Sequence, residues 1–150
     1  MSSSPQQVLE ALMRGIAARE WQGLEGLYAQ DAVVEHPFAL PTSRRSQGRD
    51  AMREHFAAFA AAPLKLQIRN WVVHVTADPE VVVAEWDYDG LVMTTGRTFH
   101  VSNIQVSRVR GGVIVESRDY HNHALMAAVM GRLPQLFAVL GDEQQKSSSS

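Results

Sequence analysis

The chain has 150 residues, of which 45% are apolar and 20% are charged, and its formal net charge is −2. These values describe one ordinary globular domain and give no electrostatic sign of a protein that binds nucleic acid or an anionic membrane. The absence of cysteine excludes disulfides, iron–sulfur clusters, thiolate zinc sites and cysteine nucleophiles. The N-terminus lacks the basic and apolar regions of a signal peptide, and no apolar run reaches the ~20 residues of a membrane span, so we expect a cytoplasmic protein.

The first half of the chain predicts three helices and one strand. We expect residues 1–5 and 142–150 to be disordered tails, because they are polar and low in complexity, around a single domain of residues 6–141. The first helix begins after Ser4 and carries an apolar stripe at helical spacing: Val8 or Leu9, Leu12 and Ile16. A second short helix presents Trp21, Leu24, Leu27 and Tyr28 on one face. A strand over 32–38, a loop over 40–47 and a third helix from about Ser46 to Ala62 follow.

The second half of the chain predicts four long strands, over 64–77, 81–93, 97–110 and 113–120. Gly111-Gly112 separates two β-branched runs, which indicates a tight hairpin turn. Between Phe99 and Val109 the apolar residues change from odd to even positions, which predicts a β-bulge. Short helices over 122–130 and 134–140, each ended by a glycine, complete the chain.

Helices first and an antiparallel meander last are typical of the α+β class. We expect a cone-shaped α+β barrel, in which a curved, mostly antiparallel sheet wraps around the N-terminal helices. Such a cone would enclose a cavity, and concave sites of this kind bind small ligands.

Three segments resemble the nuclear-transport-factor-2-like superfamily, which includes ketosteroid isomerases and SnoaL-like polyketide cyclases. WQGLEGLYAQDAVVEHP at 21–37 and QGRDAMREHF at 47–56 are similar to the superfamily's second helix, first strand and third helix. GGVIVESRDYHNHALMAAVMG at 111–131 resembles the polyketide-cyclase and phenazine-biosynthesis A/B-like branches. The resemblance implies a homodimer formed through the open face of the sheet.

The resemblance argues against ketosteroid isomerase chemistry. The position of that enzyme's general base, just before the proline that closes the first strand, is His36 here. The oxyanion tyrosine falls near Leu12, and its partner aspartate falls near Asn103 or Gln105. All three catalytic positions therefore differ.

The phenazine-like and polyketide-cyclase branches match better. A histidine on their third helix and an acidic residue near the end of the last strand correspond to His55 and Asp119. The resemblance thus implies Asp119 as catalytic acid/base and His55 as its proton partner. We expect five further side chains to orient a small hydrophobic or aromatic substrate: Tyr28, His36, Trp86, Asn103 and Tyr120. The expected function is a cofactor-independent isomerase, cyclase or dehydratase of secondary metabolism that acts by general acid–base catalysis.

Several alternatives stay open from the sequence. Asp119 could cap the helix that begins near Asn122 or pair with Arg118 or Arg108, and His55 could be a core histidine with a backbone partner. His121 and His123 invite a metal site, but no fixed ligand spacing extends beyond that pair, so we expect no metal. The alternative function is a non-catalytic ligand-binding or dimeric scaffold protein of the same fold.

Overall fold

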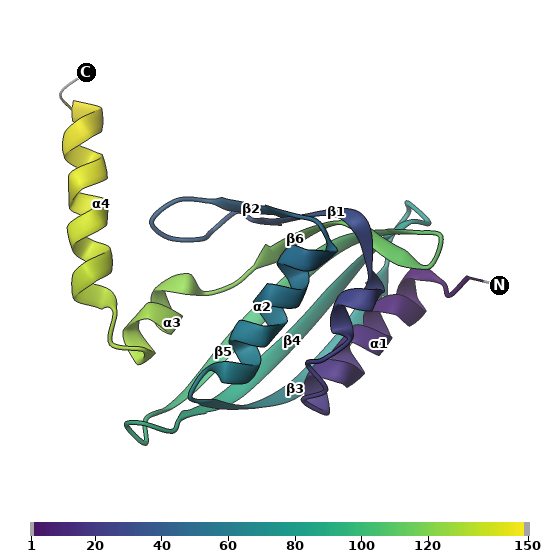
Figure 1. Cartoon of the computed structure of the whole chain (residues 1–150), viewed down its shortest axis with the longest axis horizontal. Coiled ribbons are helices and arrows are strands. Elements are labelled where there is room, and N and C mark those ends of the chain that lie inside the picture. Colours follow the sequence, from purple (N-terminus) through teal and green to yellow (C-terminus); the bar gives the residue numbers. More distant parts are fainter. Residues whose placement is uncertain (1, 149–150) are drawn as a thin grey trace.

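A computed structural model describes residues 2–148 of the chain, and its main feature is one six-stranded sheet (Figure 1). In chain order the elements are α1 (Pro5–Ala17), the 3₁₀ helix η1 (Leu24–Leu27), β1 (Tyr28–His36), β2 (Arg44–Gln47), α2 (Arg49–Ala61), β3 (Leu64–Val75), β4 (Val81–Val92), β5 (Thr98–Arg110), β6 (Val113–Tyr120), α3 (His123–Val129) and α4 (Leu133–Ser148). The four long strands predicted from the sequence are β3 to β6, with ends shifted by at most two residues. None of the described helices is both long and apolar enough to cross a bilayer.

The order of strands across the sheet is β2-β1-β6-β5-β4-β3. All neighbouring strands are antiparallel except β1 and β6, which run parallel. Helices α1 and α2 lie across one face of this sheet (Figure 1), so the predicted α+β class with a curved sheet around N-terminal helices is confirmed. The sheet is not closed into a complete barrel, because β2 and β3 remain as its two edges.

Helix α1 provides much of the core. Ser4 caps it together with Gln7 in a capping box, and Pro5 occupies the first turn, as the sequence predicts. The apolar stripe is buried against the sheet: Val8, Leu9, Leu12, Met13 and Ile16. The hairpin between β5 and β6 also forms as predicted, with Gly111 and Gly112 both at positive φ.

The second predicted helix is confirmed only in part. Only a 3₁₀ turn, η1, forms there, and Tyr28 begins strand β1 instead of completing a helical face. Gly23 adopts a left-handed conformation at φ 94, and glycine is a poor helix former, so Gly23 and Gly26 limit this segment to one turn.

The loop predicted over 40–47 contains a strand, and the third helix begins later than predicted. Arg44–Gln47 forms the short edge strand β2, paired antiparallel with β1. Helix α2 starts at Arg49, after Gly48 at φ 97, rather than at Ser46. A four-residue polar edge strand carries no apolar alternation, so the sequence gives no periodic signal for it.

The bulge predicted within β5 is wrong. Side chains alternate without interruption, and Asn103, Gln105 and Ser107 point into the interior while Ile104 is exposed. The register of β4 against β5 is continuous, and the irregularity lies between Arg108 and Val109, opposite β6. The prediction assumed that apolar residues mark the inner face, whereas here that face carries a polar strip.

Helix α4 extends beyond the predicted end at Gly141. It continues to Ser148 through a run of good helix formers, which outweighs the roughly 1 kcal/mol that an interior glycine costs. Figure 1 shows α4 (yellow) extending away from the sheet. The helix thus covers most of the segment predicted to be a C-terminal tail, while the rest of that prediction, residues 149–150, and Met1 of the N-terminal tail lie outside the described residues.

Candidate active site

A cavity of about 610 Å³ opens between the sheet and helices α2, α3 and α4. Its walls are largely apolar and include Phe59 from α2, Leu66 from β3 and Met126 from α3. Its polar lining includes His36, His55, Asn103, His121 and His123, with Arg44 and Arg132 as cationic members. The predicted cavity for a small ligand is therefore present.

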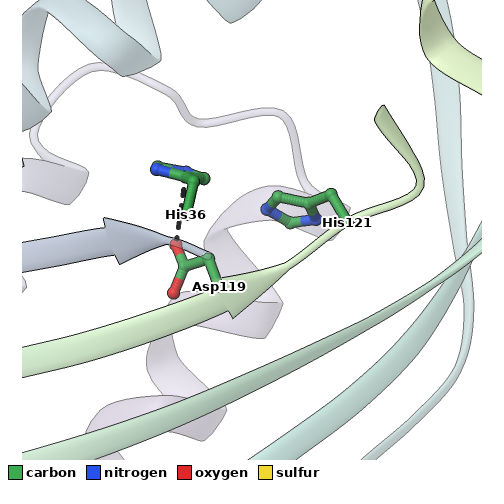
Figure 2. Close-up of side chains that lie close together, drawn as sticks. All are labelled: His36, Asp119 and His121. Atoms are coloured by element: carbon green, nitrogen blue, oxygen red, sulfur yellow. Dashed lines mark ion pairs between the residues drawn. The ribbon is translucent and has the colours of Figure 1, made fainter. Parts of the chain in front are cut away.

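The parallel pairing of β1 and β6 creates the centre of the site. Glu35 lies opposite Arg118 in the register, so the next residue on each strand, His36 and Asp119, meet at the strand ends. Nε2 of His36 is 3.9 Å from Oδ2 of Asp119, and both side chains are only 7% exposed (Figure 2). This distance is too long for a direct hydrogen bond and leaves the facing atoms free for a ligand.

A buried hydrogen-bond chain supports Asp119. Gln105 donates from Nε2 to the Ser107 hydroxyl at 3.0 Å, and the Ser107 and Ser117 hydroxyls are 2.9 Å apart. Ser117 then donates to Oδ1 of Asp119 at 2.6 Å. The chain fixes one carboxylate oxygen and turns the other, Oδ2, toward the histidines.

Burial controls the ionisation of this centre. It raises the pKa of Asp119 to about 6, against the opposing effect of the Ser117 hydrogen bond. It lowers the pKa of His36 to about 4 and that of His121 to about 3, and the positive charge of Arg44 adds to both shifts. At neutral pH the imidazoles are therefore neutral, and Asp119 is a carboxylate of unusually high basicity.

Four histidines cluster at the site, with the rings of three of them around that of His36. The ring centroid of His36 lies 5.9 Å from that of His55, 5.8 Å from that of His121 and 6.1 Å from that of His123. Burial, and then Arg44, also lowers the pKa of His55 and His123. His36 therefore lies at the centre of the histidine cluster and next to Asp119.

The predicted Asp119–His55 pair is modified by this arrangement. His55 lies on the apolar face of α2, as expected, with its ring 5.4 Å from those of Phe56 and Phe59. Among the described residues it is His36, not His55, that makes the close approach to Asp119. The catalytic roles of Asp119 and His55 stay predictions.

The other predicted substrate-binding residues divide into two groups. Tyr28 and Trp86 reach a small inner pocket beside Asp119, and Asn103 lines the main cavity. Tyr120 does not join them, because neighbouring side chains on a strand point to opposite faces and Asp119 occupies the inner one. Tyr120 packs instead against Phe38, at 5.1 Å between ring centroids.

The structural alternatives for Asp119 do not apply. Asn122 caps helix α3 by accepting a hydrogen bond from the Leu125 amide, so Asp119 is not the cap. Arg108 pairs instead with Asp78 and Glu80. Arg118, the neighbour of Asp119 on β6, is exposed on the opposite face of the strand.

Sequence reasoning missed three buried polar residues: Gln105, Ser107 and Ser117. It also left His121 outside the predicted site. The available signal was their spacing, since Ser117, Asp119 and His121 alternate along one strand and its extension.

Several buried polar atoms of the site have no hydrogen-bond partner among the described residues: His36 Nδ1, Trp86 Nε1, Asn103 Nδ2 and His123 Nε2. Such atoms suit a polar ligand.

Comparisons with known proteins agree with the fold. The chain is 28% identical over 129 residues to "Uncharacterized protein YesE" of Bacillus subtilis (83% of this chain, 86% of that protein). It is 29% identical over 119 residues to "Uncharacterized PhzA/B-like protein PA3332" of Pseudomonas aeruginosa (77% and 82%). A crystal structure named "Putative Isomerase" from Bacillus subtilis aligns with a TM-score of 0.75 and 27% identity, covering 84% of this chain and 91% of that one.

A more distant structure shares the fold alone. It is a phenazine biosynthesis-related protein of Pseudomonas aeruginosa, with a TM-score of 0.67 and 15% identity over 85% of this chain and 83% of that one. The family model described as the SnoaL-like domain matches residues 9–117. That match spans most of the chain and confirms the resemblance seen in its sequence, and the protein therefore belongs to the SnoaL-like domain family.

Proposed function

We propose that this protein is a cofactor-independent isomerase, cyclase or dehydratase of secondary metabolism. The observation that carries the proposal is the buried carboxylate of Asp119, whose pKa burial raises to about 6 and which faces His36, a lining residue of the ligand-sized cavity. A catalytic base is most effective when its pKa lies near the working pH.

Asp119 acts as the base and then as the acid. Its free oxygen, Oδ2, removes a proton from a carbon next to a carbonyl group and returns that proton to another atom of the substrate. The neutral imidazole of His36 donates a hydrogen bond to the oxygen on which negative charge develops. No proton or electron is gained or lost by the protein over one turnover, so the scheme needs no cofactor.

The lining of the cavity defines the substrate class. Apolar walls favour a small hydrophobic or aromatic molecule, and the unpartnered amide donor of Asn103 suits a carbonyl oxygen of that molecule. Arg44 and Arg132 add a preference for a substrate that also carries an anionic group.

The experiment is a deuterium-exchange assay on a panel of cyclisable keto and polyketide compounds. Loss of the α-proton signal in D₂O, followed by proton NMR, reports proton abstraction even where no net product forms. We expect Asp119→Asn to slow exchange by ~10²–10⁴-fold. His100→Gln, an exposed histidine on the outer face of the sheet, is the matched control and should leave the rate unchanged.

The alternative is a non-catalytic ligand carrier or scaffold. A scaffold would fill the cone with its own side chains, so an open cavity of about 610 Å³ favours ligand binding over a scaffold role. A carrier would bind panel compounds without exchanging their protons, and equal exchange rates for wild type and Asp119→Asn would establish that outcome.

We further propose a homodimer formed through the outer face of the sheet. Exposed apolar side chains on β3 and β5, including Val72 and Ile104, support this proposal. Light scattering on the purified protein distinguishes the dimer from a monomer.

A further inference from the structure

The side chains of His36, Asp119 and His121 converge on one point (Figure 2). One ligand atom from each lies within 4.8 Å of those of the other two. We infer that these residues form a binding site for a divalent first-row transition-metal ion such as Zn²⁺, Co²⁺ or Fe²⁺. Two imidazoles and one carboxylate on one side of an ion, with its other positions open, form a donor set that such ions favour.

The residues behind the ligands are arranged as in metal sites. His121 Nδ1 lies 2.8 Å from Oδ1 of Asn103, and an amide oxygen can only accept, so Nδ1 carries the proton and Nε2 keeps its lone pair. Ser117 occupies Oδ1 of Asp119, which leaves Oδ2 as the free ligand atom. Partners of this kind orient metal ligands and fix the imidazole tautomer.

A fourth donor lies close to the three. His123 is 5.8 Å from His121 and 6.1 Å from His36 between ring centroids, and its buried Nε2 has no partner among the described residues. A buried ring nitrogen left without a partner beside the three ligands indicates that a ligand completes this cluster.

The three ligand atoms must move slightly closer together to bind an ion. Tetrahedral coordination with bonds of about 2.0–2.1 Å places ligand atoms about 3.3 Å apart. His36 Nε2 and Asp119 Oδ2 are 3.9 Å apart, and the set as a whole lies within 4.8 Å. Side-chain rotations bring the atoms together without any change in the strands that hold them.

Charge favours an ion here and also limits its affinity. The buried carboxylate of Asp119 supplies negative charge, and the ring nitrogens of His36 and His121 supply the imidazole ligand atoms. Arg44, at the cavity lining, places a positive charge near the cluster and opposes a cation. Arg44→Gln should therefore tighten metal binding.

Metal binding goes beyond the proposed acid–base function and competes with it. An ion held by Oδ2 of Asp119 occupies the atom that would otherwise take the substrate's proton. Zn²⁺ should accordingly slow the exchange reaction, and a chelator should restore it.

The test is a titration of chelator-treated protein with Co²⁺ at pH 7.5, followed by visible absorption and calorimetry. We expect one Co²⁺ per chain, with the visible bands of low-symmetry coordination. His121→Gln and His36→Gln should each weaken binding by at least about tenfold. Circular dichroism verifies that both variants are folded, and using two variants keeps the test informative if one is not.

The control is His100→Gln. His100 lies on the exposed outer face, 2.8 Å from Asp89 and 3.9 Å from Asp87, so it is the natural place for adventitious surface binding. No binding, binding unaffected by either cavity variant, or binding lost in His100→Gln would each overturn the inference.

The metal site and the acid–base function can fail separately. If Co²⁺ does not bind while Asp119→Asn still abolishes proton exchange, the metal site is refuted and the acid–base function stands. If Co²⁺ binds as expected while the wild-type protein exchanges no protons, the metal site stands and the acid–base function is refuted.

Discussion

His36 and Asp119 lie at the ends of two parallel strands, with Nε2 of His36 3.9 Å from Oδ2 of Asp119 in a buried environment. The same burial acts on the two groups in opposite directions. It raises the pKa of the carboxyl to about 6 and lowers that of the imidazole to about 4. Their usual order of proton affinity is thereby reversed, and between about pH 4 and pH 6 Asp119 is protonated while His36 is neutral.

Asp119→Asn should stabilise the protein at alkaline pH. The pKa of Asp119 rises from its usual 3.8 to about 6 on folding, so the folded state binds the proton more tightly than the unfolded chain. That stabilisation is complete below pH 3.8 and is lost as the pH rises through 6, a change of roughly 3 kcal/mol. The contribution of an asparagine side chain to stability does not change over this pH range.

The measurement is urea unfolding of both proteins at pH 4 and pH 8. The lowered pKa values of the histidines act in the opposite direction, but they are present in both proteins and cancel in the difference. The increase in the free energy of unfolding caused by Asp119→Asn should be small at pH 4 and largest at pH 8. An equal gain at both values would mean that burial does not destabilise the Asp119 carboxylate.

Ser117→Ala should raise the pKa of Asp119 above about 6. The Ser117 hydroxyl donates to Oδ1 of Asp119, and this hydrogen bond favours the charged carboxylate. Its removal should shift the pKa upward by about one unit, measured by carbon-13 NMR of the carboxyl. Ser102→Ala, on the exposed face of β5, is the control and should leave the Asp119 pKa unchanged.

Arg44→Gln should raise the pKa values of the clustered histidines. The positive charge of Arg44 contributes to the lowered pKa of His36, His55, His121 and His123. Because Arg44 is exposed, we expect a rise of about a few tenths of a unit that disappears at high salt. Proton NMR titration of the imidazoles measures it. Arg45→Gln provides the comparison, and an equal effect from Arg45 would contradict the assignment.

Ala58→Trp should block ligand binding. Ala58 and Ala57 are both exposed on α2, but only Ala58 lines the cavity. An indole at Ala58 should weaken the binding of any panel compound by at least about tenfold while the Asp119 pKa stays near 6. Ala57→Trp is the matched control, and equal affinities for the two variants would place the ligand elsewhere.

The strands and first helix were predictable because their local signals agree with the fold. Alternation defines β4, the paired glycines define the β5–β6 turn, and Ser4 with Pro5 defines the start of α1. η1 and β2 lack such signals, since glycines interrupt one and the other is a short polar edge.

The sequence predicts which residues form the site better than it predicts which of them are in contact. Asp119, His55 and His36 are all identifiable in the sequence, yet the pairing of Asp119 with His36 depends on β1 and β6 being parallel neighbours. That pairing joins strands far apart in the chain and leaves no local pattern. Asn103 was identified, but the polar residues that follow it on the inner face of β5, Gln105 and Ser107, were missed. Polar residues on the inner face shift the apolar residues to the other parity, and this shift was interpreted as a β-bulge.

The most direct test of the acid–base account is a carbon-13 NMR titration of the Asp119 carboxyl, assigned by the loss of its signal in Asp119→Asn. The account predicts a midpoint near pH 6, with the imidazole of His36 still neutral at that pH. A midpoint near 3.8, or a His36 that is protonated at pH 6, would show an ordinary ion pair. The proposal that Asp119 is a tuned catalytic base would then be contradicted.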